Sequence, residues 1–146
     1  MGAQLCWLGR IMTMQKLVIT LYSDDSSVRK SVIAALGKQL DKDLPIHEIK
    51  EFATADALRL YVDNKKQVDL FVLDAEAVPE GGMGVARQLK DEVFNCPPVL
   101  LITGREQDNW LAAWSKAEAT VTHPIDPFNI AAKCAALLKS DSALAN

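Results

Sequence analysis

Short and nearly continuous runs of apolar residues recur along the chain, separated by polar stretches. Three of these runs are rich in β-branched residues and cover residues 17–22, 70–73 and 99–102. Runs of this length and composition are typical of parallel strands that are buried on both faces. Residues 45–52 are more polar and indicate a strand at the edge of the sheet. The sequence Thr-Val-Thr at residues 120–122 predicts a last, short strand.

Between these runs, apolar residues recur with the period of an amphipathic helix. Thr54 and Asp126 are predicted N-caps, and Pro127 stands at the first helical position after Asp126. The predicted buried faces consist of Val28, Val32, Ala35, Leu36 and Leu40; Leu58, Tyr61 and Val62; Val85, Ala86, Leu89 and Val93; Trp110, Ala113, Trp114 and Ala117; and Ile130, Cys134, Leu137 and Leu138. Five strands that alternate with five helices predict a doubly wound α/β domain.

The length and charge of the chain narrow the classes of protein to which it can belong. It has 146 residues, 49% of them hydrophobic and 24% charged, which is ordinary for one globular domain. Its 16 basic and 19 acidic residues give a net charge of −3, which argues against broad contact with nucleic acid. No apolar run approaches the roughly 20 residues of a membrane span. Three widely spaced cysteines argue against a disulfide framework or a structural zinc site, and we expect a cytoplasmic protein.

We expect the folded domain to cover residues 15–139, with residues 1–14 as an N-terminal extension and residues 140–146 as a C-terminal tail. Residues 5–12 are apolar but interrupted by Arg10, and they lack the features of a signal peptide. Two interpretations of the extension stay open. It is either foreign to the native product, with Met14 opening the domain, or an amphipathic contact segment.

Polar residues follow the predicted strands directly. Asp24 and Asp25 come after the first strand, Asp74 after the third, Thr103 after the fourth and His123 after the fifth. Because sites of doubly wound sheets form beyond the carboxyl ends of the strands, we expect these side chains to share one cleft. Crowded carboxylates repel one another unless a cation intervenes, and Mg²⁺ favours a few carboxylates plus water. A simpler interpretation of Asp24 and Asp25 is a cap for the following helix.

From residue 16 to residue 138 the chain resembles the receiver domain of bacterial two-component response regulators. Ser23 and Asp24 stand at the family's acidic pair, Asp74 at its phosphoacceptor and Gly82 at the glycine after the next loop. The resemblance implies a flavodoxin-like fold, in which a five-stranded parallel sheet of order 2-1-3-4-5 carries helices on both faces.

Four positions depart from the family's pattern. Ser23 stands in place of the first acidic residue, and Pro79 comes one residue later than the family's proline. His123 replaces the lysine that pairs with the phosphoryl oxygens, and Thr120 replaces a switching aromatic ring. The resemblance also implies a cis peptide bond between His123 and Pro124.

The chemistry implied by the resemblance is phosphoryl transfer to the carboxylate of Asp74 as the nucleophile. The Thr103 hydroxyl and the His123 ring would contact phosphoryl oxygens. A histidine is mostly neutral at pH 7, whereas the lysine it replaces is charged. We therefore expect phosphorylation that is weak, or favoured at lower pH.

The resemblance also implies a bound Mg²⁺ ion. Its ligands would be the carboxylates of Asp24 and Asp74 and the backbone carbonyl of Glu76, with Asp25 as an alternative ligand. The metal would neutralise charge on the transferred group.

We thus expect an atypical, single-domain receiver in two-component signalling, which is no enzyme beyond assisting phosphorylation and dephosphorylation of Asp74. The expected partners are a sensor histidine kinase or phosphotransfer protein, and a target protein at residues 110–116 and 130–138. Trp110 and Trp114 are more typical of core than of contact positions, so an exposed tryptophan there would favour this face. We expect no direct contact with nucleic acid or membrane, and either a monomer or a homodimer.

Two alternatives remain open. The first is a pseudo-receiver that binds protein independently of phosphorylation. The second is a flavodoxin-like small-molecule enzyme or cofactor binder, since a fold does not fix a function. The chain shows no phosphate-cradling glycine loop, which argues against the second.

Overall fold

A five-stranded parallel sheet forms the centre of the molecule. The computed structural model describes residues 16–105 and 113–145. The strands are β1 (Leu17–Tyr22), β2 (His47–Phe52), β3 (Leu70–Asp74), β4 (Val99–Thr103) and β5 (Ala119–Thr122). They lie in the order β2-β1-β3-β4-β5, and all four neighbouring pairs are parallel. The predicted strand order and fold class are therefore confirmed.

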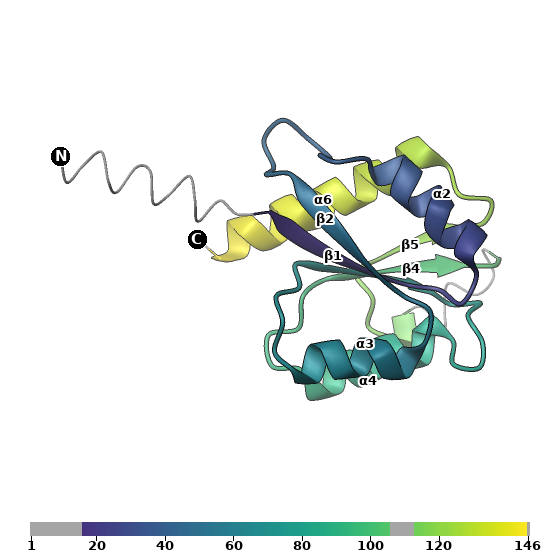
Figure 1. The fold of residues 1–146 in the computed structure, drawn as a ribbon. Coiled ribbons are helices and arrows are strands. Elements are labelled where there is room, and N and C mark those ends of the chain that lie inside the picture. Colours follow the sequence, from purple (N-terminus) through teal and green to yellow (C-terminus); the bar gives the residue numbers. More distant parts are fainter. Residues whose placement is uncertain (1–15, 106–112, 146) are drawn as a thin grey trace.

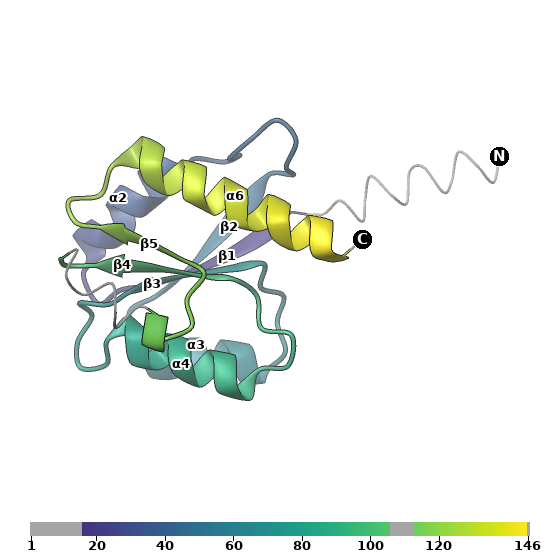
Figure 2. The same cartoon turned by 180° about the vertical axis from the view of Figure 1, so that it is seen from behind.

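Helices cover both faces of this sheet, as Figures 1 and 2 show. On one face lie α2 (Ser26–Leu36) and α6 (Pro127–Ala145), and on the other lie α3 (Ala55–Asp63) and α4 (Gly82–Glu92). Each face has its own cluster of buried apolar side chains. Because successive side chains of a strand point to opposite faces, the same strands supply both clusters. The three central strands accordingly read as continuous apolar runs.

Local chemistry sets where the helices begin. The Asp25 carboxylate accepts a hydrogen bond from the Ser27 amide and caps α2, and the Thr54 hydroxyl accepts one from Ala57 and caps α3. Capping by Thr54 was predicted from the sequence and is confirmed.

The ends of two helices differ from the sequence-based expectation. The pattern extends the first helix to Leu40, but α2 ends at Leu36 because Gly37 adopts a left-handed φ of 58°. Leu40 still packs against the cluster formed with α2 and α6. At the other end of the chain, α6 continues to Ala145, through residues for which we predicted a tail. That segment contains no glycine or proline that would end a helix. Within the described residues, no helix has the length and apolar character needed to cross a membrane.

Candidate functional site

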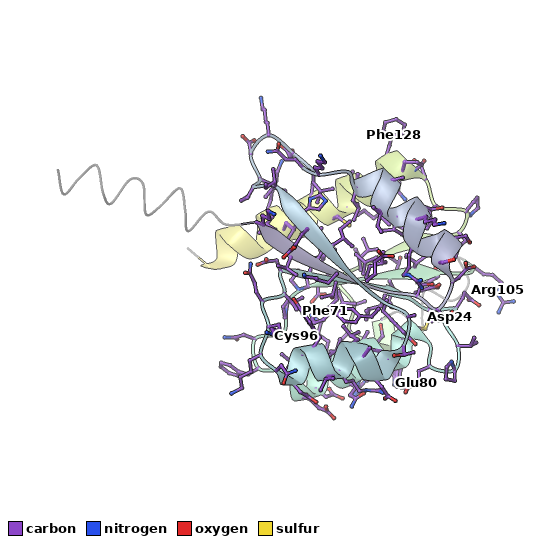
Figure 3. All side chains as sticks on the ribbon, in the orientation of Figure 1. Asp24, Phe71, Glu80, Cys96, Arg105 and Phe128 are labelled. Atoms are coloured by element: carbon purple, nitrogen blue, oxygen red, sulfur yellow. The ribbon has the colours of Figure 1, made fainter. Side chains whose placement is uncertain are left out.

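Asp74 is the last residue of β3, in the middle of the sheet, where its side chain is buried and only 2% of the residue is exposed. β3 lies between β1 and β4, so the residues that follow or end these strands flank Asp74. Ser23 follows β1 and Thr103 ends β4. In Figure 3, Asp24 and Arg105 mark this end of the sheet, and Cys96 lies toward the opposite end.

Both carboxylate oxygens of Asp74 accept hydrogen bonds from the chain itself. The Ser23 hydroxyl donates to Oδ2 at 2.7 Å, and the Glu76 amide donates to Oδ1 at 2.9 Å. Ser23 is fully buried, and its oxygen in turn accepts a hydrogen bond from the Asp25 amide at 3.1 Å. A buried carboxylate needs such donors, because burial without them carries a large desolvation penalty. Ser23, which the alignment of motifs places at an acidic position, thus serves as a donor to Asp74.

His123 faces the other side of the same carboxylate. Its Nε2 lies 3.9 Å from Asp74 Oδ1, and 29% of its side chain is exposed. This distance is too long for a hydrogen bond, but it allows a charge interaction when the ring is protonated. The peptide bond between His123 and Pro124 is cis, as predicted.

Thr103 is buried at the end of β4, and its hydroxyl is directed toward β5. Its contacts are the carbonyl of Val121 at 3.4 Å and the hydroxyl of Thr122 at 3.2 Å. The sequence predicts that Thr103 lies in the same cleft as Asp74. In this structure its hydroxyl contacts two residues of β5.

The two aspartates after β1 have different roles. Asp24 is exposed, and its Oδ1 accepts a hydrogen bond from the Val78 amide at 3.3 Å. Asp25 accepts hydrogen bonds from the amide and hydroxyl of Ser27 at 2.8 and 2.7 Å, and these bonds lower the pKa of its carboxyl. The helix-cap interpretation is therefore correct for Asp25. Its carboxylate binds the start of α2 instead of taking the place of an acidic residue at Ser23.

The loop after Asp74 packs closely on the site, a feature that sequence patterns missed. A Cβ atom at Gly82 would lie 2.8 Å from the Asp74 carbonyl oxygen, so only glycine allows this approach. A Cβ atom at Gly104 would lie 2.3 Å from Oε1 of Glu76, which places the Glu76 side chain against the loop after β4. The Glu76 side chain therefore packs next to the end of β4.

The same loop is anchored at Glu80, shown in Figure 3 on the side of α3. The Glu80 carboxylate forms a two-point ion pair with Arg59 of α3, and its backbone carbonyl accepts a hydrogen bond from the Tyr22 hydroxyl at 2.5 Å. Hydrogen bonding to Glu80 raises the pKa of Arg59, and burial followed by the Glu80 charge raises that of Tyr22. No short sequence motif marks these residues, because they meet only in the folded chain.

The donor set around Asp74 is small for a divalent cation. Within residues 16–105 and 113–145, no group of three or more His, Cys, Asp or Glu side chains is placed to hold a metal. The predicted set consists of the carboxylates of Asp24 and Asp74 and the backbone carbonyl of Glu76, with Asp25 as an alternative ligand. Asp25 caps α2, and both oxygens of Asp74 already accept hydrogen bonds. Mg²⁺ requires near-octahedral oxygen ligands and usually binds several waters besides its carboxylates. The residues present do not fit Mg²⁺ in this arrangement.

The predicted partner face lies beside α4. Trp114 is 51% exposed, so the expectation that it belongs to the core is wrong. Arg87 of α4 lies 5.3 Å above its ring and donates a hydrogen bond to its carbonyl at 2.9 Å, and Lys116 pairs with Asp91 at 2.8 Å. Cation–π stacking of this kind stabilises a tryptophan at the surface. Trp110 lies outside the described residues.

The α6 part of that face is mostly turned inward. Ile130, Cys134 and Leu138 are buried against the sheet and α2, while Ala132 and Ala136 are exposed. A partner at residues 130–138 would therefore contact mainly small side chains, whereas Phe128 in the first turn of α6 is 87% exposed.

Comparisons with known proteins agree with this geometry. An "Uncharacterized response regulatory protein" of Mycobacterium tuberculosis (strain CDC 1551 / Oshkosh) is 48% identical over 124 residues, which make up 85% of this chain and 92% of the relative. The chain belongs to the response regulators. A response regulatory protein of strain ATCC 25618 / H37Rv matches with the same identity and coverage. No protein-family model matches this response regulator.

Solved receiver domains share its fold. The receiver domain protein (CheY-like) of Methanospirillum hungatei JF-1 superposes with a TM-score of 0.72 at 16% identity, over 88% of this chain and 98% of that one. The BeF3-activated DrrB receiver domain gives a TM-score of 0.68 at 20% identity, over 86% and 99% of the two chains. The response regulator is thus built as a receiver domain.

Proposed function

We propose that this response regulator passes its signal by protein contact, and that the residues around Asp74 control that contact. The observation that carries the proposal is the arrangement at the end of β3, where Ser23 and His123 flank a buried aspartate. Receiver domains work in two-component signalling with histidine kinases or phosphotransfer proteins. We assign this chain the same class of partner and a cytoplasmic location.

In the first version of the proposal, Asp74 accepts a phosphoryl group. A carboxylate oxygen attacks the phosphorus atom, and the bond from phosphorus to the donor breaks, so that the donor leaves with the electron pair. We assign His123, 3.9 Å from Asp74, and Thr103, at the end of the neighbouring strand, to contacts with the transferred group. Receiver domains generally bind Mg²⁺ at an acidic pocket, whereas the residues around Asp74 in this chain do not fit the ion.

In the second version the chain is a pseudo-receiver that binds its target without phosphorylation. The 2.7 Å hydrogen bond from Ser23 to Asp74 favours this version, because a hydrogen bond to a carboxylate oxygen lowers its nucleophilicity. Among the described residues, no group of three or more His, Cys, Asp or Glu side chains is placed to hold a metal, which points the same way. In neither version is the chain a metabolic enzyme.

Intact-mass spectrometry after incubation with acetyl phosphate and Mg²⁺ separates the two versions. The parent chain and Asp74→Asn are compared between about pH 5.5 and 8. A single phosphoryl adduct on the parent, absent from the variant and stronger at lower pH, would establish Asp74 as phosphoacceptor with a contribution from His123. If no adduct forms at any pH while the fold stays intact, the first version is wrong and the pseudo-receiver stands.

We assign the contact surface to Trp114 together with Arg87 and Lys116. The exposed ring beneath the Arg87 guanidinium supports this assignment, since tryptophan and arginine dominate the binding energy of many interfaces. The test is affinity for a captured partner, with Trp114→Ala compared with Phe94→Ala. Phe94 is 91% exposed in the loop between α4 and β4 and provides the control for an exposed aromatic ring. Equal affinity of the two variants would contradict the assignment.

A further inference from the structure

A serine, Ser23, stands at the first acidic position of the family and donates a hydrogen bond to Asp74, the residue at the phosphoacceptor position. Ser23 is fully buried, donates to Asp74 Oδ2 at 2.7 Å and accepts from the Asp25 amide at 3.1 Å. Two hydrogen bonds on one hydroxyl fix its orientation, because a hydroxyl has one hydrogen to donate. Ser23 is therefore a constrained donor to Asp74.

A carboxylate at the same position would behave in the opposite way. It has no hydrogen to donate when ionised, and two carboxylates within this distance repel each other. Such a pair needs a cation between the oxygens, whereas the Ser23–Asp74 pair does not. The second oxygen of Asp74 is likewise bonded within the chain, to the Glu76 amide at 2.9 Å.

No neighbouring carboxylate takes the place of the acidic residue that Ser23 replaces. Asp25 caps α2 through Ser27, and Asp24 is exposed and accepts the Val78 amide at 3.3 Å. The Glu76 side chain lies against Gly104. The carboxylates of Asp24, Asp25 and Glu76 thus each contact a residue other than Asp74.

We propose that the Ser23 hydroxyl replaces a divalent cation at Asp74, so that this site is stable without metal and excludes Mg²⁺ at millimolar concentration. Ser23 is then the residue that determines whether the pocket binds a cation. The proposal rests on the proposed function in one respect, in that it takes the residues around Asp74 as the family's acidic pocket.

Thermal unfolding of the full chain, in EDTA and in 10 mM Mg²⁺, tests this proposal. The parent chain should show the same Tm in both solutions, within about 1 °C. Ser23→Asp should be less stable in EDTA, and Mg²⁺ should raise its Tm by roughly 5–10 °C once the ion exceeds its Kd about a hundredfold. Ser26→Asp adds the same charge at an exposed position on the first turn of α2 and should show no response to Mg²⁺.

A comparable Mg²⁺ response in the parent chain would overturn the proposal, and so would the lack of any response in Ser23→Asp. If Ser23→Asp does not fold in EDTA, Mn²⁺ added to the parent chain decides the question by paramagnetic broadening. The amides of Asp24 and Glu76 should stay sharp in millimolar Mn²⁺, and selective broadening there would show a cation site. These measurements are independent of phosphorylation, so a chain that is not phosphorylated can still confirm or contradict the role of Ser23.

Discussion

At the scale of single residues, the hydrogen bond between Ser23 and Asp74 governs the local stability of the site. Both groups are buried, and the acceptor is a carboxylate, so the bond is of the charge-assisted kind. Removing one partner of such a bond leaves the other desolvated and unpaired. The effect on folding should therefore exceed that of an exposed serine.

We expect Ser23→Ala to lower the free energy of unfolding by about 1–3 kcal/mol, because Asp74 Oδ2 loses its donor. Urea denaturation followed by circular dichroism measures this change. Ser27→Ala is the matched control: its hydroxyl also donates to an aspartate, Asp25, but at the surface. A loss in Ser23→Ala no larger than in the control would mean that water replaces the missing donor.

His47 is a second buried polar residue, far from the site, at the start of β2. Its Nε2 lies 2.7 Å from the Gly37 carbonyl, which identifies this nitrogen as the protonated one, and its Nδ1 is buried without a partner among the described residues. Burial lowers the pKa of His47, because a charged ring would be desolvated there.

This shift predicts a pH dependence of stability. In the unfolded chain, His47 binds a proton near its reference pKa of about 6.5. In the folded chain it binds this proton only at lower pH. The contribution of His47 is therefore fully present above about pH 6.5 and is lost as the pH falls through the lowered pKa. His47→Gln, whose amide can still donate to Gly37, should show a smaller loss between pH 7 and 5 in urea denaturation. Parallel pH profiles of the two proteins would rule out this role.

At the scale of elements, the sequence predicts the strands better than the helix ends. The apolar runs that become β1, β3 and β4 are unambiguous because both faces of these strands are buried. The end of α2 was missed because Leu40 satisfies the helical period while Gly37, three residues earlier, ends the helix. Periodicity reports which side chains are buried, and a residue beyond a turn can share the same core.

In the site, too, some features can be predicted from the sequence and others cannot. Asp74 and Ser23 could be located from the sequence, since each directly follows or ends an apolar run. The contacts of Arg59 with Glu80, and of Glu76 with Gly104, could not, because they join loops and helices that are distant in sequence. The helix-cap role of Asp25 was one of two interpretations, and the contact with Ser27 decides between them.

The start of α3 gives a prediction at this scale. Thr54→Ala removes the side-chain acceptor of the Ala57 amide, which lies 3.2 Å from it, and should reduce stability by about 0.5–2 kcal/mol. Thr54→Ser preserves the oxygen and should stay close to the parent chain. Urea midpoints of the three proteins measure the difference. An equal loss in both variants would assign the effect to the methyl group of Thr54 and not to the cap.

At the scale of the whole molecule, two apolar clusters share one sheet. One contains Cys134 and Leu138 of α6 packed over β1, β3 and β4, and the other lies beneath α3 and α4. Each central strand contributes alternate side chains to both clusters. Unfolding of either helical layer would therefore expose apolar side chains of the sheet to water. A domain of this size usually unfolds in a single cooperative step. The two layers should therefore lose their structure together.

Cys134 reports on this coupling because its thiol is fully buried, and burial raises its pKa to about 12. A thiol protonated in this way does not react until it is exposed. In a Cys6→Ser, Cys96→Ser background, labelling of Cys134 by a thiol reagent should appear at the same urea concentration as the loss of helical circular dichroism. Leu138→Ala, one turn further along α6, should shift both transitions equally toward lower urea. Labelling that precedes the circular dichroism change would instead mean that α6 detaches first, and the two clusters would then be separate folding units.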